Sequence, residues 1–156
     1  METRYYGAFG SNLSHKQMKV RCPASTPFKP SYLENYMLTF KSVADVVPYP
    51  KKRVPIGIYS ITTPCEAALD QYESYPHLYT KKFVNLAIPG DLILVMIYVM
   101  NKEYGFGKPS EAYYRVIGEG YNDWGIDQKL LVEARDYSIK NDKGEAFRSK
   151  RWDNAV

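Results

Sequence analysis

The stretch LYTKKFVNLAIPGDLILVMIYVM, residues 78–100, decides the fold class. Two runs rich in β-branched and aromatic residues, 78–88 and 92–100, flank the turn Pro89-Gly90-Asp91. This pattern is typical of an antiparallel hairpin. The second run is also the longest apolar run of the chain, and it is far shorter than the ~20 residues that a membrane-spanning helix needs. The sequence therefore predicts a pair of strands and no membrane helix.

Other elements are predicted on both sides of the hairpin. Strands are expected at residues 3–9, 36–43 and 54–61. Helices are expected at 15–21, 65–74 and 110–119, with Ser14, Thr63 and Ser110 at their N-termini as caps, and a two-turn helix is expected at 129–135. Residues 22–32, which hold three prolines, are expected to be irregular, and residues 45–53 to form a turn. We predict an α+β fold with a small mixed or antiparallel, barrel-like sheet and flanking helices.

Composition restricts the function classes. The 156 residues suit a single domain with a buried core, and a net charge of +4 is too small for a dedicated nucleic-acid-binding protein. Cys22 and Cys65 form no metal-ligand pattern with the two histidines. The first six residues lack the apolar core of a signal peptide, so a reducing cytoplasm is expected. The 15 tyrosines predict a cavity or interface lined by Tyr.

One carboxylate stands at an unusual place in the second predicted helix. Glu73 lies four residues after Leu69 and therefore on the same side of the helix, leaning toward the core. It also lies in the last turn, where the helix dipole is negative, close in sequence to Tyr72, Tyr75 and Tyr79. Both features raise the pKa of Glu73, which suits a general base. The alternative is a solvated Glu at a frayed helix end, the commoner place for a charged residue.

The segment GAFGSNL, residues 7–13, forms the predicted turn between the first strand and the first helix. Backbone N–H groups of Gly10, Ser11, Asn12 and Leu13 can bind a carboxylate, a phosphate or a developing oxyanion. Gly10 also permits close approach of a ligand and a positive φ. The alternative is a simple connector, because Gly, Ser and Asn are common turn residues.

Together the two segments resemble the signatures of one family, the gamma-glutamylcyclotransferase-like proteins, which include the AIG2-like group. YGAFGSNL, residues 6–13, resembles the opening signature YGSNL, and LDQYESYPHLY, residues 69–79, resembles the second signature LDxxEGYPxxY. The resemblance extends over residues 5–126. We therefore expect a domain of this family at residues 1–126 and a C-terminal extension at 127–156, packed on the domain or trailing from it.

The resemblance implies a function and a set of site residues. It implies a cofactor-independent and metal-free enzyme that releases 5-oxoproline and an amine or amino acid from a gamma-glutamyl substrate by intramolecular attack. Glu73 matches the family's general acid/base. The matching substrate-binding positions are Phe9, Gly10, Ser11, Asn12, Leu13 and Tyr79. Two departures can change substrate preference: Phe9 stands where the family usually has Tyr, and Ser74 stands where Gly usually follows the glutamate.

Two other functions stay open. The first is a non-catalytic protein that binds a small anionic metabolite in the same cup, because a fold does not determine a function. The second is a nucleic-acid surface formed by tyrosines, by Lys51, Lys52 and Arg53, and by the basic residues between 140 and 151; it is the least favoured, because short basic runs are usually solvated. The expected partner is therefore a small gamma-glutamyl compound, with neither nucleic acid nor membrane, and a homodimer is left open.

Overall fold

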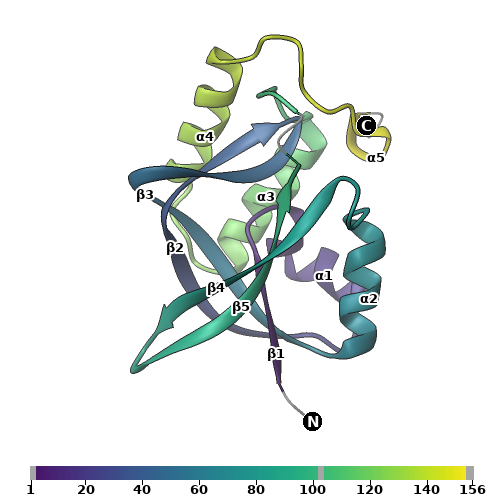
Figure 1. Cartoon of the computed structure of the whole chain (residues 1–156), viewed down its shortest axis with the longest axis vertical. Helices are drawn as coiled ribbons and strands as arrows, with labels where there is room; N and C mark the ends of the chain where they lie inside the picture. Colours follow the sequence, from purple (N-terminus) through teal and green to yellow (C-terminus); the bar gives the residue numbers. More distant parts are fainter. Residues whose placement is uncertain (1–2, 102–103, 154–156) are drawn as a thin grey trace.

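The computed structural model of the chain describes residues 3–101 and 104–153 (Figure 1). Five strands form one mixed sheet in the order β2-β3-β1-β5-β4. Their bounds are β1 (Arg4–Ala8), β2 (Thr26–Lys41), β3 (Val43–Ile61), β4 (Tyr79–Ile88) and β5 (Asp91–Met100). Strand β1 pairs antiparallel with β3 and parallel with β5, and so joins the hairpins β2–β3 and β4–β5. The predicted α+β class with a mixed sheet is confirmed.

The sheet is curved, and its two edge strands approach each other. The hydroxyl of Ser31 on β2 donates a hydrogen bond to the carbonyl of Ala87 on β4 at 2.6 Å. In the described part of the chain, however, no backbone ladder joins β2 to β4, so the sheet is not closed into a barrel. The barrel-like character that the sequence predicts is therefore curvature without closure.

The strands of the hairpin β4–β5 agree with the predicted ranges 78–88 and 92–100 to within one residue at each end. Its register runs from Tyr79 opposite Met100 to Ile88 opposite Asp91. Only Pro89 and Gly90 lie between the two strands. This confirmed element carries Tyr79 at one end, near the C-terminal end of the preceding helix.

The predicted irregular segment 22–32 and the predicted turn 45–53 are largely wrong. Most of these residues belong to the long hairpin of β2 and β3, which pairs Thr26 with Ser60 and Lys41 with Val43. The prolines of β2 are tolerated because β2 is an edge strand. Those near the middle of β3 are tolerated because β1 pairs with only the last residues of β3, Gly57–Ile61. Long-range pairing, which no local pattern shows, decides the strand content here.

Helices flank the sheet: α1 (His15–Arg21), α2 (Thr63–Tyr72), α3 (Glu111–Asp123), α4 (Lys129–Lys140) and the short α5 (Lys150–Asp153). Ser14 and Ser110 cap α1 and α3 as predicted, because their hydroxyls accept hydrogen bonds from the backbone N–H groups of Gln17 and Tyr113, at 3.3 and 3.2 Å. A short 3₁₀ helix, Ser11–Leu13, lies between β1 and α1. These helices therefore begin where hydroxyl side chains can satisfy free N–H groups.

The N-cap of helix α2 lies one residue earlier than the sequence predicts, and the helix itself, Thr63–Tyr72, lies two residues earlier than the predicted range 65–74. Its cap is Thr62, not Thr63, because the Thr62 hydroxyl accepts a hydrogen bond from the N–H of Cys65 at 3.3 Å. Glu66 is then one residue too far along the helix to close a capping box. Its carboxylate instead forms ion pairs with Arg4 and with Lys81, the latter at 2.7 Å.

The buried core lies between the sheet and the helices. Helix α3 packs on the 3₁₀ helix, α1 packs on α2, and α4 packs on β2. Leu13, Tyr59, Ile117 and Tyr121 are among the fully buried side chains that connect these elements. None of the described helices is long and apolar enough to cross a membrane. The division of the chain at residue 126 stays a prediction.

Candidate active site

A pocket of about 320 Å³ opens between the loop after β1 and the C-terminal end of α2. It is lined by Glu73 and by five of the predicted substrate-binding residues: Phe9, Gly10, Ser11, Asn12 and Tyr79. Two segments that lie far apart in the sequence are thus brought together. Leu13, the other predicted residue, is fully buried and does not line the pocket.

Two hydrogen bonds of the Leu13 backbone stabilise the loop that carries Gly10, Ser11 and Asn12. The N–H of Leu13 donates to the carbonyl of Gly10 at 3.0 Å, so it is not available to a ligand. The carbonyl of Leu13 accepts a hydrogen bond from the indole of Trp124 at 2.8 Å. Gly10 has a φ of −112°, so the positive φ that the sequence suggested is not present. Leu13 therefore supports the loop, and Gly10 allows the backbone to pack closely against its neighbours.

Asn12 and Ser11 are also fixed by tyrosines. The Asn12 side-chain amide donates to the hydroxyl of Tyr6 at 3.0 Å, and the Asn12 carbonyl accepts from the hydroxyl of Tyr59 at 2.8 Å. The hydroxyls of Ser11 and Tyr72 lie 3.0 Å apart and form a hydrogen bond that links the loop to α2. The loop is therefore preorganised before any ligand binds.

Glu73 is positioned by the way α2 ends. It is the C-cap residue of the helix. The N–H of Ser74 donates to the carbonyl of Gln71 at 3.2 Å, and the N–H of Tyr75 donates to the carbonyl of Asp70 at 2.9 Å. These two bonds form a Schellman motif, which needs a left-handed residue after the cap. Ser74 fills that place with a φ of 52°. The motif fixes the direction in which the Glu73 side chain leaves the backbone.

Ser74→Gly is expected to stabilise the protein by about 0.5–1 kcal/mol. A side chain in the left-handed region costs about 1–2 kcal/mol, and the entropy that glycine loses on folding offsets about 0.5–1 kcal/mol of that gain. Urea unfolding measures the change. Ser74→Ala is the matched control, because it keeps the Cβ atom and should give no gain. Equal stability of the glycine and alanine variants would show that the left-handed conformation costs nothing here.

The surroundings of Glu73 adjust its acidity. The side chain is half-buried, and burial raises the pKa of Glu73 to about 7, against the opposing effect of the Arg21 and Arg151 guanidinium groups. The sequence predicts the same direction, but burial is the main cause. Within the part of the chain that the structure describes, no hydrogen bond or ion pair engages its carboxylate. Glu73 can therefore exchange a proton with a ligand near neutral pH.

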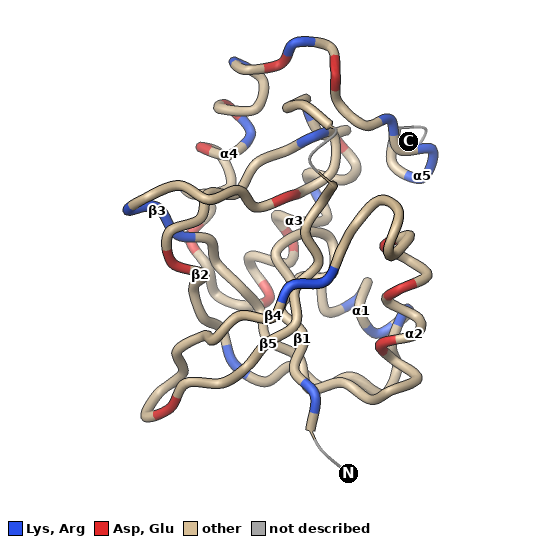
Figure 2. The backbone as a smooth tube through the Cα atoms, in the orientation of Figure 1, with Lys and Arg blue, Asp and Glu red and all other residues tan. Residues whose placement is uncertain are grey.

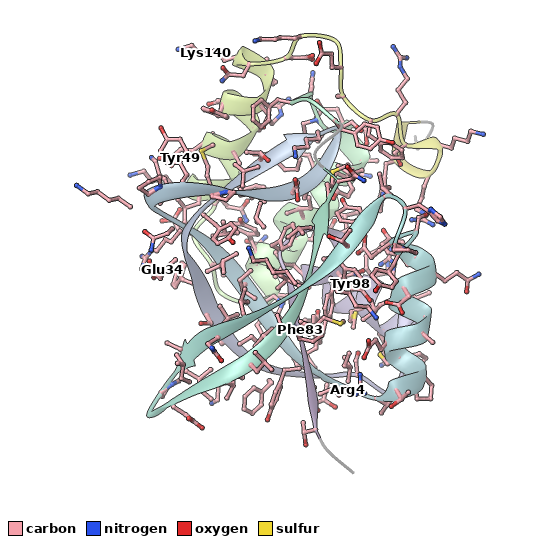
Figure 3. The ribbon with its side chains drawn as sticks, viewed as in Figure 1. Arg4, Glu34, Tyr49, Phe83, Tyr98 and Lys140 are labelled. Carbon is pink, nitrogen blue, oxygen red and sulfur yellow. The ribbon has the colours of Figure 1, made fainter. Side chains whose placement is uncertain are left out.

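Three tyrosines that the site prediction does not include also line the pocket: Tyr72, Tyr98 and Tyr113. Tyr98 extends from β5 toward α2 (Figure 3), and its hydroxyl donates to the Asp70 carboxylate at 2.6 Å. The Tyr113 hydroxyl accepts a hydrogen bond from the N–H of Ala44 at 2.8 Å. Burial raises the pKa of Tyr113 and of Tyr79 well above the usual range, so both hydroxyls stay neutral. This is the Tyr-lined cavity that the composition predicts.

Residues 147–152, here called the C-terminal segment, line a further part of the pocket. The segment includes the start of α5, and Figure 2 shows its basic residues beside the C-terminal end of α2. The sequence marks this region as basic but has no local pattern that places it at the site. Across residues 3–101 and 104–152, no group of His, Cys, Asp and Glu side chains is arranged to hold a metal ion.

Comparisons with known proteins add the following similarities. A family model described as "Gamma-glutamyl cyclotransferase, AIG2-like" matches residues 6–124. A solved structure named "Gamma-glutamyl cyclotransferase" is similar with a TM-score of 0.77 and 21% identity, over 96% of this chain and 95% of that one. An uncharacterized protein from Homo sapiens gives a TM-score of 0.77 and 21% identity, over 97% and 96%.

YkqA from Bacillus subtilis is similar with a TM-score of 0.76 and 16% identity, over 92% of this chain and 57% of the longer bacterial chain. At these identities the structural similarities show a shared fold. No curated relative matches the sequence significantly. The family match, which covers most of the chain and includes both Gly10 and Glu73, is therefore the comparison that bears on the pocket.

Proposed function

Because the chain belongs to the gamma-glutamyl cyclotransferase, AIG2-like family, we propose that it is an enzyme that releases 5-oxoproline and an amine or amino acid from a gamma-glutamyl compound. One observation carries the proposal: the Glu73 carboxylate, whose pKa is raised to about 7, shares a small pocket with Gly10, Ser11 and Asn12. A proton acceptor and a preorganised loop together suit an acyl transfer in which the substrate supplies its own nucleophile.

The proposed reaction closes a five-membered lactam. Glu73 takes a proton from the α-ammonium group of the substrate, and the resulting amine attacks the side-chain carbonyl carbon of the same glutamyl group. The carbonyl becomes a tetrahedral oxyanion and then reforms as the bond to the leaving nitrogen breaks. Glu73 returns its proton to that nitrogen. The ring nitrogen loses its second ammonium proton to solvent, and the released amine takes one up.

Each part of the pocket has a role in this proposal. Holding the chain of the substrate in a bent shape supplies much of the rate, because the attack is intramolecular. Backbone N–H groups of the loop at Gly10, Ser11 and Asn12 bind the α-carboxylate or the oxyanion. Tyr79 and Phe9 bound the cavity in which the glutamyl chain bends. The hydrogen bonds that fix the loop keep these positions constant through the reaction.

The direct test is incubation of the protein with a panel of gamma-glutamyl amino acids, peptides and amines. Release of 5-oxoproline, measured by mass spectrometry, supports the enzyme. The second candidate is a protein that binds a small anionic metabolite in the same pocket, which the basic residues of the C-terminal segment favour. Binding of panel members without any release of 5-oxoproline would favour that candidate.

The pH dependence of kcat/KM provides an independent prediction. Glu73 must be ionised to accept a proton, so the rate is lost as the pH falls through its pKa. Because burial raises this pKa from its usual value of 4.5 to about 7, kcat/KM is expected to rise about tenfold per pH unit up to pH 7 and then to level off. A limb centred near pH 4.5 would contradict this environment for Glu73.

A further inference from the structure

The C-terminal segment is fixed over the pocket by aromatic packing. The ring of Phe147 lies 5.2 Å from that of Tyr104, and the ring of Trp152 lies 5.0 Å from that of Tyr113, centroid to centroid. Ser149, between them, is buried, and its hydroxyl accepts a hydrogen bond from the N–H of Trp152 at 3.2 Å. The C-terminal segment is therefore held in place as one wall of the pocket.

Residues 145–146, just before the C-terminal segment, also help to place it at the pocket. The N–H of Gly105 donates to the carbonyl of Glu145 at 3.0 Å. A Cβ atom at Gly107 would lie 2.3 Å from the Cβ atom of Ala146, a distance that real side chains do not allow. The close approach of residues 145–146 therefore requires glycine at position 107. This path places the C-terminal segment beside the pocket.

Arg151 connects this wall to the helix that ends at Glu73. Its guanidinium carbon lies 4.1 Å from the centroid of the Tyr72 ring, and one of its N–H groups donates to the Tyr72 carbonyl at 3.2 Å. The guanidinium of Arg21 lies 3.7 Å from the same centroid. Two cations cannot share one face at these distances, so they lie on opposite faces. Arg151 is the one that lines the pocket.

The charges around the pocket do not match a gamma-glutamyl group alone. That group carries one carboxylate and one ammonium, and is neutral overall. Among the described lining residues, Glu73 is the one acid, whereas the C-terminal segment supplies the guanidinium groups of Arg148 and Arg151. Glu73 and the loop already account for both charges of the glutamyl group in the proposed reaction. Arg151, which lines the pocket, is therefore placed to pair with an anionic group on another part of the substrate.

Resting on the proposed function, we propose that the C-terminal segment selects gamma-glutamyl substrates whose leaving amine carries a carboxylate, and that Arg151 is its recognition residue. Arginine suits this role, because its planar guanidinium can donate two hydrogen bonds to one carboxylate. The contact with the Tyr72 carbonyl uses only one of its five N–H donors and holds the group in place. The preferred substrates are therefore gamma-glutamyl amino acids or peptides rather than gamma-glutamyl amines.

Two matched substrates isolate this preference: gamma-glutamyl-alanine and gamma-glutamyl-ethylamide, which differ only in the carboxylate of the leaving group. The wild-type protein should prefer the alanine compound. In Arg151→Ala the ratio of the two kcat/KM values should fall about ten- to a hundredfold, as expected for loss of a hydrogen-bonded charge pair. The change should lie mainly in KM, because the leaving-group carboxylate takes no part in the bonds that change. Arg151→Lys should retain part of the preference.

Arg53→Ala is the matched control. The guanidinium of Arg53 also stacks on a tyrosine, Tyr32, at 3.9 Å, but this pair does not line the pocket. Its ratio should equal that of the wild type. If both substrates release 5-oxoproline and the ratio is unchanged in Arg151→Ala, or the wild type prefers the ethylamide, the inference is wrong and the proposed function stands. If neither substrate reacts with the wild type, the inference is overturned, and the proposed function is overturned as well if no other member of the panel releases 5-oxoproline.

Discussion

Glu73→Gln is expected to lower kcat by about a thousandfold or more while the fold is kept. The amide has nearly the shape of the carboxyl group but cannot accept a proton at neutral pH. General base and general acid steps are each typically worth about a hundredfold or more, and in the proposed reaction one group performs both. Release of 5-oxoproline from the best substrate of the panel, followed at pH 8, measures the loss.

Stability separates this loss from misfolding. Because burial raises the pKa of Glu73, the folded protein holds the proton more tightly than the unfolded chain does. Ionisation of Glu73 therefore lowers the free energy of unfolding of the wild-type protein as the pH rises from about 4.5 to about 7. The Gln variant avoids this cost, so at pH 8 it should be at least as stable as the wild type. Loss of activity with a lower melting temperature would instead indicate a damaged fold.

Glu119→Gln is the matched control for the chemistry. Glu119 is exposed on α3 and does not line the pocket, so its amide variant should keep wild-type activity. A folded Glu73→Gln variant with near-wild-type kcat would overturn the assignment. The same holds for an acid limb that survives in it, because another group would then titrate. Glu73 would in that case be a solvated carboxylate at a helix end.

Gly10→Val is expected to lower kcat/KM by about a hundredfold or more, through both kcat and KM. A Cβ atom at Gly10 would lie 3.1 Å from the Tyr113 hydroxyl and 3.3 Å from the Cβ atom of Ala44. The two additional methyl groups of valine must displace these neighbours or occupy the pocket. A displacement of about 1 Å in an active site can cost about a hundredfold in rate. Steady-state kinetics with the preferred substrate provide the measurement.

A graded series identifies the cause. Gly10→Ala adds only the Cβ atom and should have a smaller effect than valine in the same direction. Overpacking of this kind costs about 1–3 kcal/mol of stability, so thermal unfolding is recorded for each variant. Kinetics of a folded Gly10→Val protein that equal those of the wild type would show that the loop is only a connector between β1 and α1.

The sequence predicts elements well where their determinants are local. The hairpin around Pro89 and Gly90 and the caps at Ser14 and Ser110 depend on neighbouring residues, and all are confirmed. The hairpin of β2 and β3 is missed because its prolines argue against strands. Their tolerance depends on β2 being an edge strand, which is a property of the whole sheet.

The site follows the same rule. The position of Glu73 at the end of α2 and the loop at Gly10 are both indicated by the residues themselves, and the family resemblance implies the role of each. Tyr98 and Tyr113 lie in predicted elements, but which face of each element borders the pocket depends on packing. The role of Arg151 is harder to predict from the sequence. Its contact with Tyr72 depends on the path of residues 145–146 past Gly107, which is a long-range feature of the fold.

The place of β1 in the sheet has a consequence for the order of folding. Each hairpin closes over a short turn, whereas β1 needs partners from both hairpins, at Ile61 on one side and Met96 on the other. Contacts between distant residues form late, because their loop-closure entropy must be met first. The loop after β1 therefore takes its shape only when the two hairpins have docked. Catalytic competence should appear in the last phase of refolding, after most of the secondary structure has formed.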